Sequence, residues 1–160
     1  MEDIKRILVL SRYTKECKKA VSYGISLARC YGAELYVLHV LHPPYLIEGW
    51  ILPKFIEEEY NKLQADAKKD LDNMIEREKE DGMPITVLIR KGHPTEEVLK
   101  VVKELNIGLL IMTSHKAGRM EHFFLFRCTE ELMRKMPCSI ILVKQEPGPP
   151  VYYEYEEPDS

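Results

Sequence analysis

The sequence predicts a three-layer α/β sandwich, a doubly wound fold in which a five-stranded parallel sheet lies between two layers of helices. Short, mostly apolar runs alternate with helical segments along the chain, and the first of them, residues 7–10, is apolar throughout rather than at every second residue. Continuous apolar runs are typical of strands that are buried on both faces. Right-handed crossovers then place each connecting helix across the sheet.

The first strand is predicted over residues 7–10, and a helix follows it with Thr14 as its N-cap and Gly32 at its end. Residues that recur at threes and fours define the buried face of this helix: Ala20, Gly24, Leu27, Ala28 and Tyr31. The second strand covers residues 35–41. It ends before Pro43 and Pro44, which cannot donate to a strand ladder.

A long amphipathic helix is predicted from Phe55 to just before Gly82, because its apolar residues recur at helical spacing among charged ones. The apolar segment 45–52, with Trp50, is expected to be a loop at the carboxyl end of the sheet.

The third strand is predicted at 85–89, followed by a turn at Gly92 and Pro94 and a helix with Thr95 as its N-cap. The fourth strand is predicted at 109–112. After a loop from Thr113 to about Leu125, a last helix ends before Pro137, and the fifth strand covers 139–143.

The length of 160 residues, with 45% hydrophobic and 31% charged residues, fits one domain, predicted at 1–144. Residues 145–160 are predicted to form a flexible acidic tail, because they carry five acidic residues, no Lys or Arg, and several Pro and Tyr. The net charge of -3 gives no indication of nucleic-acid binding. Without a signal-peptide pattern or a membrane-length apolar run, the protein is expected to be cytoplasmic and not membrane-bound.

In doubly wound sheets, ligands bind beyond the carboxyl ends of the strands, where the strand order reverses. A phosphate-binding loop there needs glycines, because only they let successive backbone amides close on an anion. The loop after the first strand reads Ser11-Arg12-Tyr13-Thr14 and has none. The chain also lacks the Walker, dinucleotide, nucleophile-elbow and zinc-protease motifs, so no catalytic residue is predicted.

Several segments resemble the universal stress protein family. They are Ile7-Leu8-Val9, Gly32-Ala33-Glu34-Leu35 leading into Leu38-His39-Val40, Lys91-Gly92-His93-Pro94, Leu110-Ile111-Met112 with His115, and Pro137-Cys138, and together they cover residues 4–144. The resemblance implies an adenine nucleotide alpha hydrolase-like fold. It also implies a homodimer through the last strand, Ile140 to Val143.

Many family members bind ATP through an acidic residue after the first strand and a G-x2-G-x9-G-[ST] motif after the fourth. When the motif is matched to this sequence without gaps, Arg12 occupies the acidic position and Arg127 the hydroxyl position. The three glycine positions are occupied by Thr113, Lys116 and Phe126. A guanidinium cannot accept hydrogen bonds from a ribose, and bulky side chains fill the space that phosphate needs. ATP binding of the family type is therefore expected to be lost or much weakened, unless a register shifted to Gly118 rescues part of the loop.

A second interpretation of the same loops is an anion site. The candidate ligand crevice comprises Arg12, Val40, Thr113, His115, Lys116, Arg119, Phe126 and Arg127. Its cations suit phosphates or carboxylates, so a nucleotide or another anionic small molecule is an alternative ligand, with weak hydrolysis as an alternative activity. The competing interpretation is that these cations are solvated or pair with Glu121 and Glu130.

The remaining polar residues suggest structural roles. His93 lies in a tight turn with no nucleophile tied to it, and the five histidines have no metal-ligand spacing, so no metal is predicted. The four cysteines form no C-x-x-C pair and are expected to be reduced packing residues. The alternative for Cys128 is a reactive thiol, if the neighbouring Arg127 lowers its pKa.

The resulting prediction is a universal stress protein-like, non-catalytic stress-response or regulatory protein without a cofactor. Its partners would be a second copy of itself and an unidentified protein. An adenylating enzyme would need a glycine- and serine-rich pyrophosphate loop after the first strand, where Arg12 and Tyr13 stand.

Overall fold

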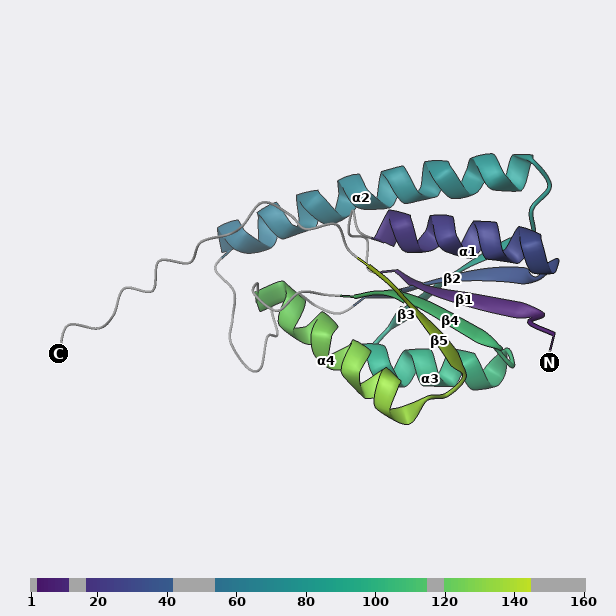
Figure 1. Ribbon diagram of the computed structural model, residues 1–160. Coiled ribbons are helices and arrows are strands. Elements are labelled where there is room, and N and C mark those ends of the chain that lie inside the picture. The colour runs from purple at the N-terminus through teal and green to yellow at the C-terminus, as the bar shows by residue number, and fades with distance from the viewer. Residues whose placement is uncertain (1–2, 12–16, 42–53, 115–119, 145–160) are drawn as a thin grey trace.

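The computed structural model describes residues 3–11, 17–41, 54–114 and 120–144. Its strands and helices alternate along the chain (Figure 1) in the order β1 (Arg6–Ser11), α1 (Cys17–Tyr31), β2 (Glu34–Leu41), α2 (Lys54–Glu80), β3 (Ile85–Lys91), α3 (Pro94–Glu104), β4 (Leu109–Thr113), α4 (Met120–Lys135) and β5 (Ser139–Val143). The predicted Thr14 cap, the 45–52 loop and the tail at 145–160 lie outside the described residues.

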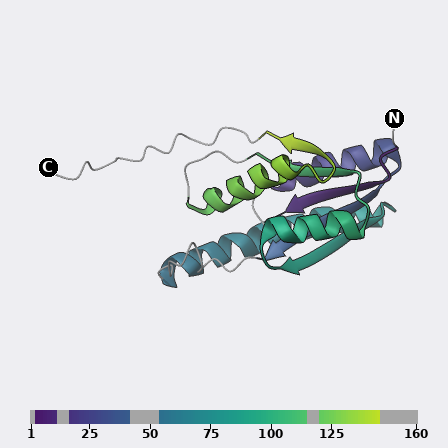
Figure 2. The same ribbon diagram turned by 90° about the horizontal axis from the view of Figure 1, so that it is seen from below.

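The strands form one five-stranded sheet in the order β3-β2-β1-β4-β5, and every neighbouring pair is parallel. Helices α1 and α2 cover one face of this sheet, and α3 and α4 cover the other, which gives three layers (Figures 1 and 2). The predicted fold class is confirmed. The strand order reverses between β1 and β4, because the chain builds outward from β1 to β3 and then returns to the other side of β1.

The core has two apolar clusters, one on each face of the sheet. Ile7, Val9, Leu35 and Ile111 point to the α1 and α2 side, where Val21 and Leu71 are among the residues that meet them. The intervening residues Leu8, Leu38, Leu110 and Met112 point to the other side and pack with Val98 and Leu132. Burial on both faces explains why these strands read as unbroken apolar runs.

Two glycines end helices as the sequence predicts. Gly32 follows α1 with φ +62, and Gly82 follows α2 with φ +87. Both angles are in the left-handed region that favours glycine after a helix.

Three expectations about the helices are wrong in detail. The loop predicted to run to about Leu125 is shorter, because α4 already begins at Met120. The N-cap of α3 is His93, with Pro94 as the first helical residue, and the Thr95 side chain instead hydrogen-bonds Glu131 of α4. Tyr31 does not belong to the buried face of α1, because 56% of it is exposed. The buried face is instead formed by Cys17, Ala20, Val21, Gly24, Ile25 and Ala28.

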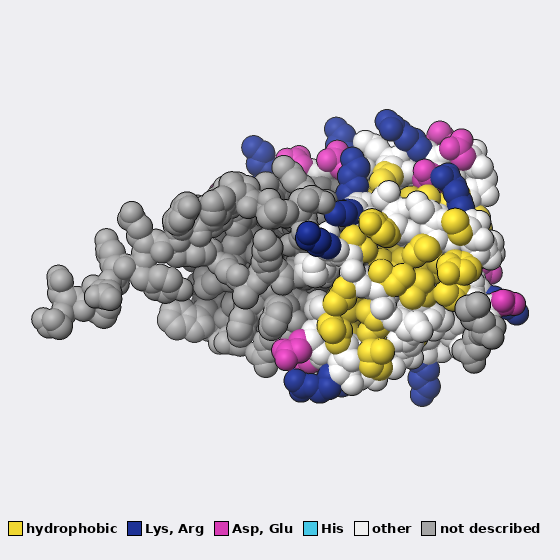
Figure 3. Space-filling model, viewed as in Figure 1, with side chains coloured by type: hydrophobic (Ala, Val, Ile, Leu, Met, Phe, Trp, Pro, Cys, Tyr) yellow, Lys and Arg dark blue, Asp and Glu magenta, His cyan; other side chains and the backbone are white. Residues whose placement is uncertain are grey.

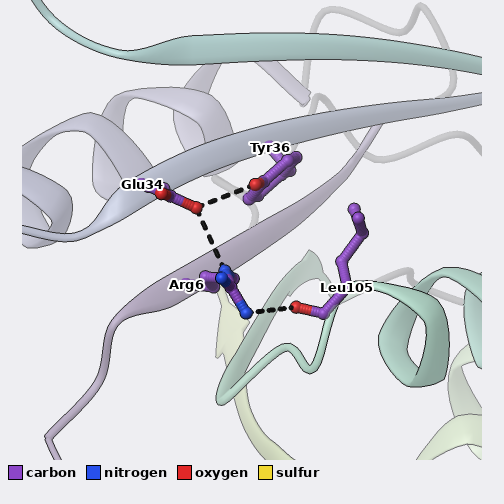
Figure 4. A network of polar contacts seen from close by, with 4 residues as sticks. All are labelled: Arg6, Glu34, Tyr36 and Leu105. Carbon is purple, nitrogen blue, oxygen red and sulfur yellow. Dashed lines mark hydrogen bonds and ion pairs between the residues drawn. The ribbon is translucent and has the colours of Figure 1, made fainter.

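A polar network ties the strands to α3 at the amino edge of the sheet (Figure 4). The Arg6 side chain donates to Glu34 at 3.1 Å and to the carbonyl oxygen of Leu105 at 3.2 Å, and the Tyr36 hydroxyl donates to Glu34 at 2.8 Å. The Tyr36 hydrogen bond and then Arg6 lower the pKa of Glu34. Arg6 thereby satisfies a carbonyl group at the C-cap of α3, opposite the edge where ligands bind in such folds.

Candidate functional site

The reversal of strand order places the expected ligand position beyond the carboxyl ends of β1 and β4. These strands end at Ser11 and Thr113, and β2 ends beside β1 at Leu41. Figure 2 shows the strand tips at one end of the molecule, with the amino-terminal part of α2 extending past them.

The structure describes part of the predicted crevice. Val40 and Thr113 are in strands, and the backbone of Phe126 and Arg127 is in α4, but the side chains of those two residues are outside what the structure describes. Arg12, His115, Lys116 and Arg119 also lie outside the described residues.

Val40 and Thr113 are both buried, yet their side chains point to opposite faces of the sheet. Val40 packs in the apolar cluster on the α3 and α4 side. Thr113 follows Ile111 by two residues and therefore points to the α1 and α2 side. Val40 and Thr113 therefore approach the strand tips from opposite faces of the sheet, and of these two residues Thr113 is the polar one.

A buried polar row crosses the α1 and α2 face at this edge. His39 pairs in register with Ser11. The pairing of β1 with β4 ends at Val9 and Ile111, and extending that register by two residues puts Thr113 next to Ser11. His39 and Ser11 are each 0% exposed and Thr113 is 4% exposed. Two residues earlier in the same strands, the residues that point to the α1 and α2 side are apolar: Val37, Val9 and Ile111. The polar row therefore marks the boundary between the core and the strand tips.

The sequence contained a signal for this row. In each of the three strands, the polar residue lies two positions after an inward-facing apolar residue. Only the strand order and register reveal that the three residues are neighbours.

The environment of His39 favours its neutral form. Burial lowers the pKa of His39 from 6.5 to about 4; Asp72 of α2 opposes this shift, and Lys68 of α2 adds to it. Lys68 and Asp72 form an ion pair at 2.7 Å on one turn of that helix. A Ser and a His side by side can suggest nucleophilic catalysis, but a nucleophile must reach its substrate. Ser11 and His39 are both 0% exposed, so neither side chain reaches the surface in this structure.

The beginning of α3 is a second polar corner at the carboxyl edge. Gly92 has φ +143, and a Cβ built on it would lie 3.3 Å from a carboxylate oxygen of Glu97. Glu97 accepts a hydrogen bond from Lys100 at 2.7 Å, and this contact raises the pKa of Lys100. His93 is exposed in the preceding turn, where its backbone carbonyl accepts the first helical hydrogen bond from Glu97. This corner is consistent with the structural role predicted for His93.

Cysteines and metal ligands give no further site among the described residues. The four cysteines form no disulfide, and Cys17 and Cys128 are buried. Burial raises the pKa of the Cys138 thiol, which makes its reactive thiolate form less populated. The described part of the chain has no cluster of three or more His, Cys, Asp or Glu that could hold a metal ion.

Among the described helices, none has the length and apolar character needed to cross a bilayer.

Comparisons with known proteins agree with this architecture. The sequence model of the universal stress protein family matches residues 3–144. Universal stress protein MJ0577 of Methanocaldococcus jannaschii is 31% identical over 156 residues, covering 89% of this chain and 96% of that protein. Its solved structure superposes with a TM-score of 0.66 and 23% identity, covering 92% of this chain and all of that chain.

A second solved structure, a universal stress protein family protein from Arabidopsis thaliana with AMP bound, has a TM-score of 0.55 and 16% identity. It covers 89% of this chain and 92% of its own. The parallel sheet in the order β3-β2-β1-β4-β5 and the match over residues 3–144 lead to one conclusion. This chain belongs to the universal stress protein family.

Proposed function

We propose that this protein is a non-catalytic stress-response or regulatory protein of the cytoplasm that acts by binding a partner, and that it does not bind ATP through the family's glycine motif. The observation that carries the proposal is Thr113 at the position of the first motif glycine. It is buried at the tip of β4, next to the reversal of strand order.

The steric argument concerns how closely backbone and phosphate can approach. A glycine at the end of β4 leaves its backbone open, whereas Thr113 carries a branched Cβ that is enclosed by protein. The other motif positions carry Lys116, Phe126 and Arg127 in the sequence, and each is larger than the residue that the motif requires. A triphosphate would therefore lack the open backbone amides that bind it.

The polar groups at the strand tips also support a binding role without turnover. Ser11 and His39 are fully buried. A reaction would need a group that contacts both substrate and solvent-accessible space.

Calorimetry on the full chain, purified without added nucleotide, tests the ATP part of the proposal. We expect no saturable heat with ATP and Mg²⁺ at micromolar concentrations. A variant that rebuilds the motif, with Arg12→Asp, Thr113→Gly, Lys116→Gly, Phe126→Gly and Arg127→Ser, provides the comparison and is expected to gain binding. Micromolar ATP affinity in the wild-type protein would overturn the proposal.

We also propose that the protein forms a homodimer through β5, which is the last strand on one side of the sheet. Figure 3 shows apolar side chains gathered over β5 and the adjoining flank of α1. We call this surface the β5 patch and assign to it, from the helix positions argued in the next paragraph, the exposed or half-buried apolar residues Tyr23, Leu27, Tyr31, Met133, Met136 and Leu142. An apolar surface beside an unpaired strand favours association with another chain.

The helix contacts explain why the apolar flanks face β5. Arg29 of α1 pairs with Glu78 of α2, and Leu27 lies about 200° around the helix from Arg29, on the flank away from α2. In α4, Glu131 accepts a hydrogen bond from Thr95 of α3, and Met133 lies on the flank away from α3. Both flanks therefore turn toward the edge of the sheet that β5 forms.

Sedimentation velocity at micromolar concentration tests the dimer. Leu142→Glu places a charge in the β5 patch and is expected to give monomers. Ile89→Glu is the matched control, because Ile89 is an exposed apolar residue on β3, at the opposite edge of the sheet. Monomeric wild-type protein, or equal effects of the two variants, would contradict dimerisation through β5.

The second candidate function is binding of an anionic small molecule, and the structural relative with AMP bound favours it. In this alternative, Arg127 supplies a charge-assisted hydrogen bond to a phosphate. Arg127→Ala should weaken AMP binding by about 1.5 to 3 kcal/mol, whereas Arg134→Ala, in the exposed last turn of α4, should leave it unchanged. Equal AMP binding by both variants would exclude this role for Arg127.

A further inference from the structure

The outer edge of β5 has backbone groups that can accept another strand. The Val143 carbonyl accepts a hydrogen bond from the Ser114 N–H at 3.0 Å, so the backbone N–H and C=O of Val143 point toward β4. Alternate residues of a parallel strand direct their N–H and C=O groups to opposite sides. Ile140 and Leu142 therefore direct theirs away from β4, where the described residues place no further strand.

We propose that residues 151–155 of this chain bind to that edge as a sixth strand, antiparallel to β5. The segment reads Val-Tyr-Tyr-Glu-Tyr, in which four of the five residues are strongly strand-favouring types. It has the same length as β5, Ser139–Val143. The inference rests on the same surface as the proposed dimer and adds a means of regulating it.

The length of the connection suits an antiparallel return. The chain leaves β5 after Val143, and residues 144–150 would form the turn. This stretch contains Pro147, Gly148, Pro149 and Pro150, which are residues that favour turns and end strands. Val151 would lie opposite Val143, and Tyr155 opposite Ser139.

In this register the hydrogen-bonding groups match. Tyr152 and Glu154 would lie opposite Leu142 and Ile140, and each pair would exchange N–H and C=O bonds. Neither tail residue is a proline, so both N–H groups are available in the sequence.

The side chains match as well. Residues directly opposite each other in an antiparallel pair share a face of the sheet. Tyr153 would therefore lie beside Ile141 on the α1 face, next to the flank of the β5 patch that carries Leu27 and Tyr31. Tyr152 would lie beside Leu142 on the other face.

The charges that follow the segment complete the match. Glu156, Glu157 and Asp159 would continue past the amino end of β5. The last turn of α4, a few residues before β5, carries the exposed cations Arg134 and Lys135. Opposite charges at this end favour the antiparallel direction over the parallel one.

Strand addition in this way has a functional consequence. The tail of one chain and the β5 strand of a second chain would compete for the same N–H and C=O groups. The tail thereby acts as an autoinhibitory contact that masks the dimer surface until it is displaced.

Amide hydrogen exchange on the full chain tests the inference, at a dilution where sedimentation shows monomers. Glu154→Pro removes an N–H that would bond to β5, and Glu157→Pro is the matched control, with the same charge change beyond the paired segment. We expect exchange at Ile140 and Leu142 to become about tenfold faster in Glu154→Pro, because a backbone hydrogen-bond pair is lost. Glu157→Pro should keep the wild-type rate. Equal exchange in Glu154→Pro and the wild-type protein would overturn the proposal.

Sedimentation of the same proteins separates this inference from the proposed dimer. If the tail masks β5, Glu154→Pro should dimerise about tenfold more tightly than Glu157→Pro. Faster exchange without dimerisation would support the sixth strand and refute the dimer. Equally tight dimers of all three proteins would support the dimer and refute masking by the tail.

Discussion

Protonation of His39 is expected to destabilise this protein in mild acid. His39 is 0% exposed in β2, and burial lowers its pKa to about 4 in the folded protein, against 6.5 for the ordinary side chain. The unfolded chain therefore binds a proton between pH 6.5 and pH 4 that the folded chain does not, so stability falls as the pH falls through this window. The contribution of neutral His39 is complete above pH 6.5 and is lost by about pH 4.

The magnitude follows from the two pKa values. A pKa difference of about 2.5 corresponds to about 3 kcal/mol of unfolding free energy, of which about 2 kcal/mol is already lost at pH 5. The charges acting on His39 are on α2, where Asp72 favours the protonated form and Lys68 disfavours it. They pair with each other, which leaves burial as the dominant effect.

Urea unfolding at a series of pH values from 7.5 to 5 measures this effect. With an m-value of about 2 kcal/mol/M, the wild-type midpoint should fall by about 1 M over this range. His39→Gln cannot be protonated and should have a nearly flat profile, whereas His93→Gln, at an exposed position, should retain the wild-type slope. Slopes are compared rather than absolute stabilities, because the substitution also changes packing.

Two results would refute the reasoning about His39. One is an equal pH slope for the wild-type protein and His39→Gln. The other is an NMR titration in which the His39 imidazole of the folded wild-type protein has a pKa near 6.5, a measurement that does not require the variant to fold.

Two packing predictions accompany it. Gly24→Ala should destabilise the protein by about 1 to 3 kcal/mol despite the better helix propensity of alanine, because the new Cβ would lie 2.5 Å from Cγ2 of Val9. The control Ser22→Ala, at an exposed position of the same helix, should not destabilise the protein. Equal urea midpoints for the two variants would contradict a steric clash at Gly24. Thr95→Val should cost about 1 to 2 kcal/mol, because a buried hydroxyl loses its 2.7 Å hydrogen bond to the Glu131 carboxylate. In a double-mutant cycle with Glu131→Gln, the losses of unfolding free energy of the two single variants should not add in the double variant. Additive losses would show that the Thr95–Glu131 hydrogen bond contributes nothing to stability.

The alternation of buried runs and amphipathic segments was sufficient to predict the fold class. Residues 7–10 and 109–112 are strands that are buried and apolar on both faces, and such strands need helices on both sides of the sheet. Residues 35–41 and 139–143 are also strands, as their mostly apolar sequences predict. Gly32 and Gly82 end helices through their own backbone freedom. These features depend on local chemistry, and a sequence therefore carries them directly.

The tertiary structure decided which residues are neighbours. The spacing of apolar residues predicts which residues face inward, but only strand order and register show which residues are neighbours. Strand order and register place His39, Ser11 and Thr113 in one buried row. Likewise, the spacing of Tyr31 fits the inner face of α1, yet 56% of this residue is exposed in the folded protein. The sequence by itself predicted a mobile acidic tail, because that composition cannot form a core alone. Only the tertiary structure showed that β5 lies at the end of the sheet, which is the edge to which we propose that this tail binds.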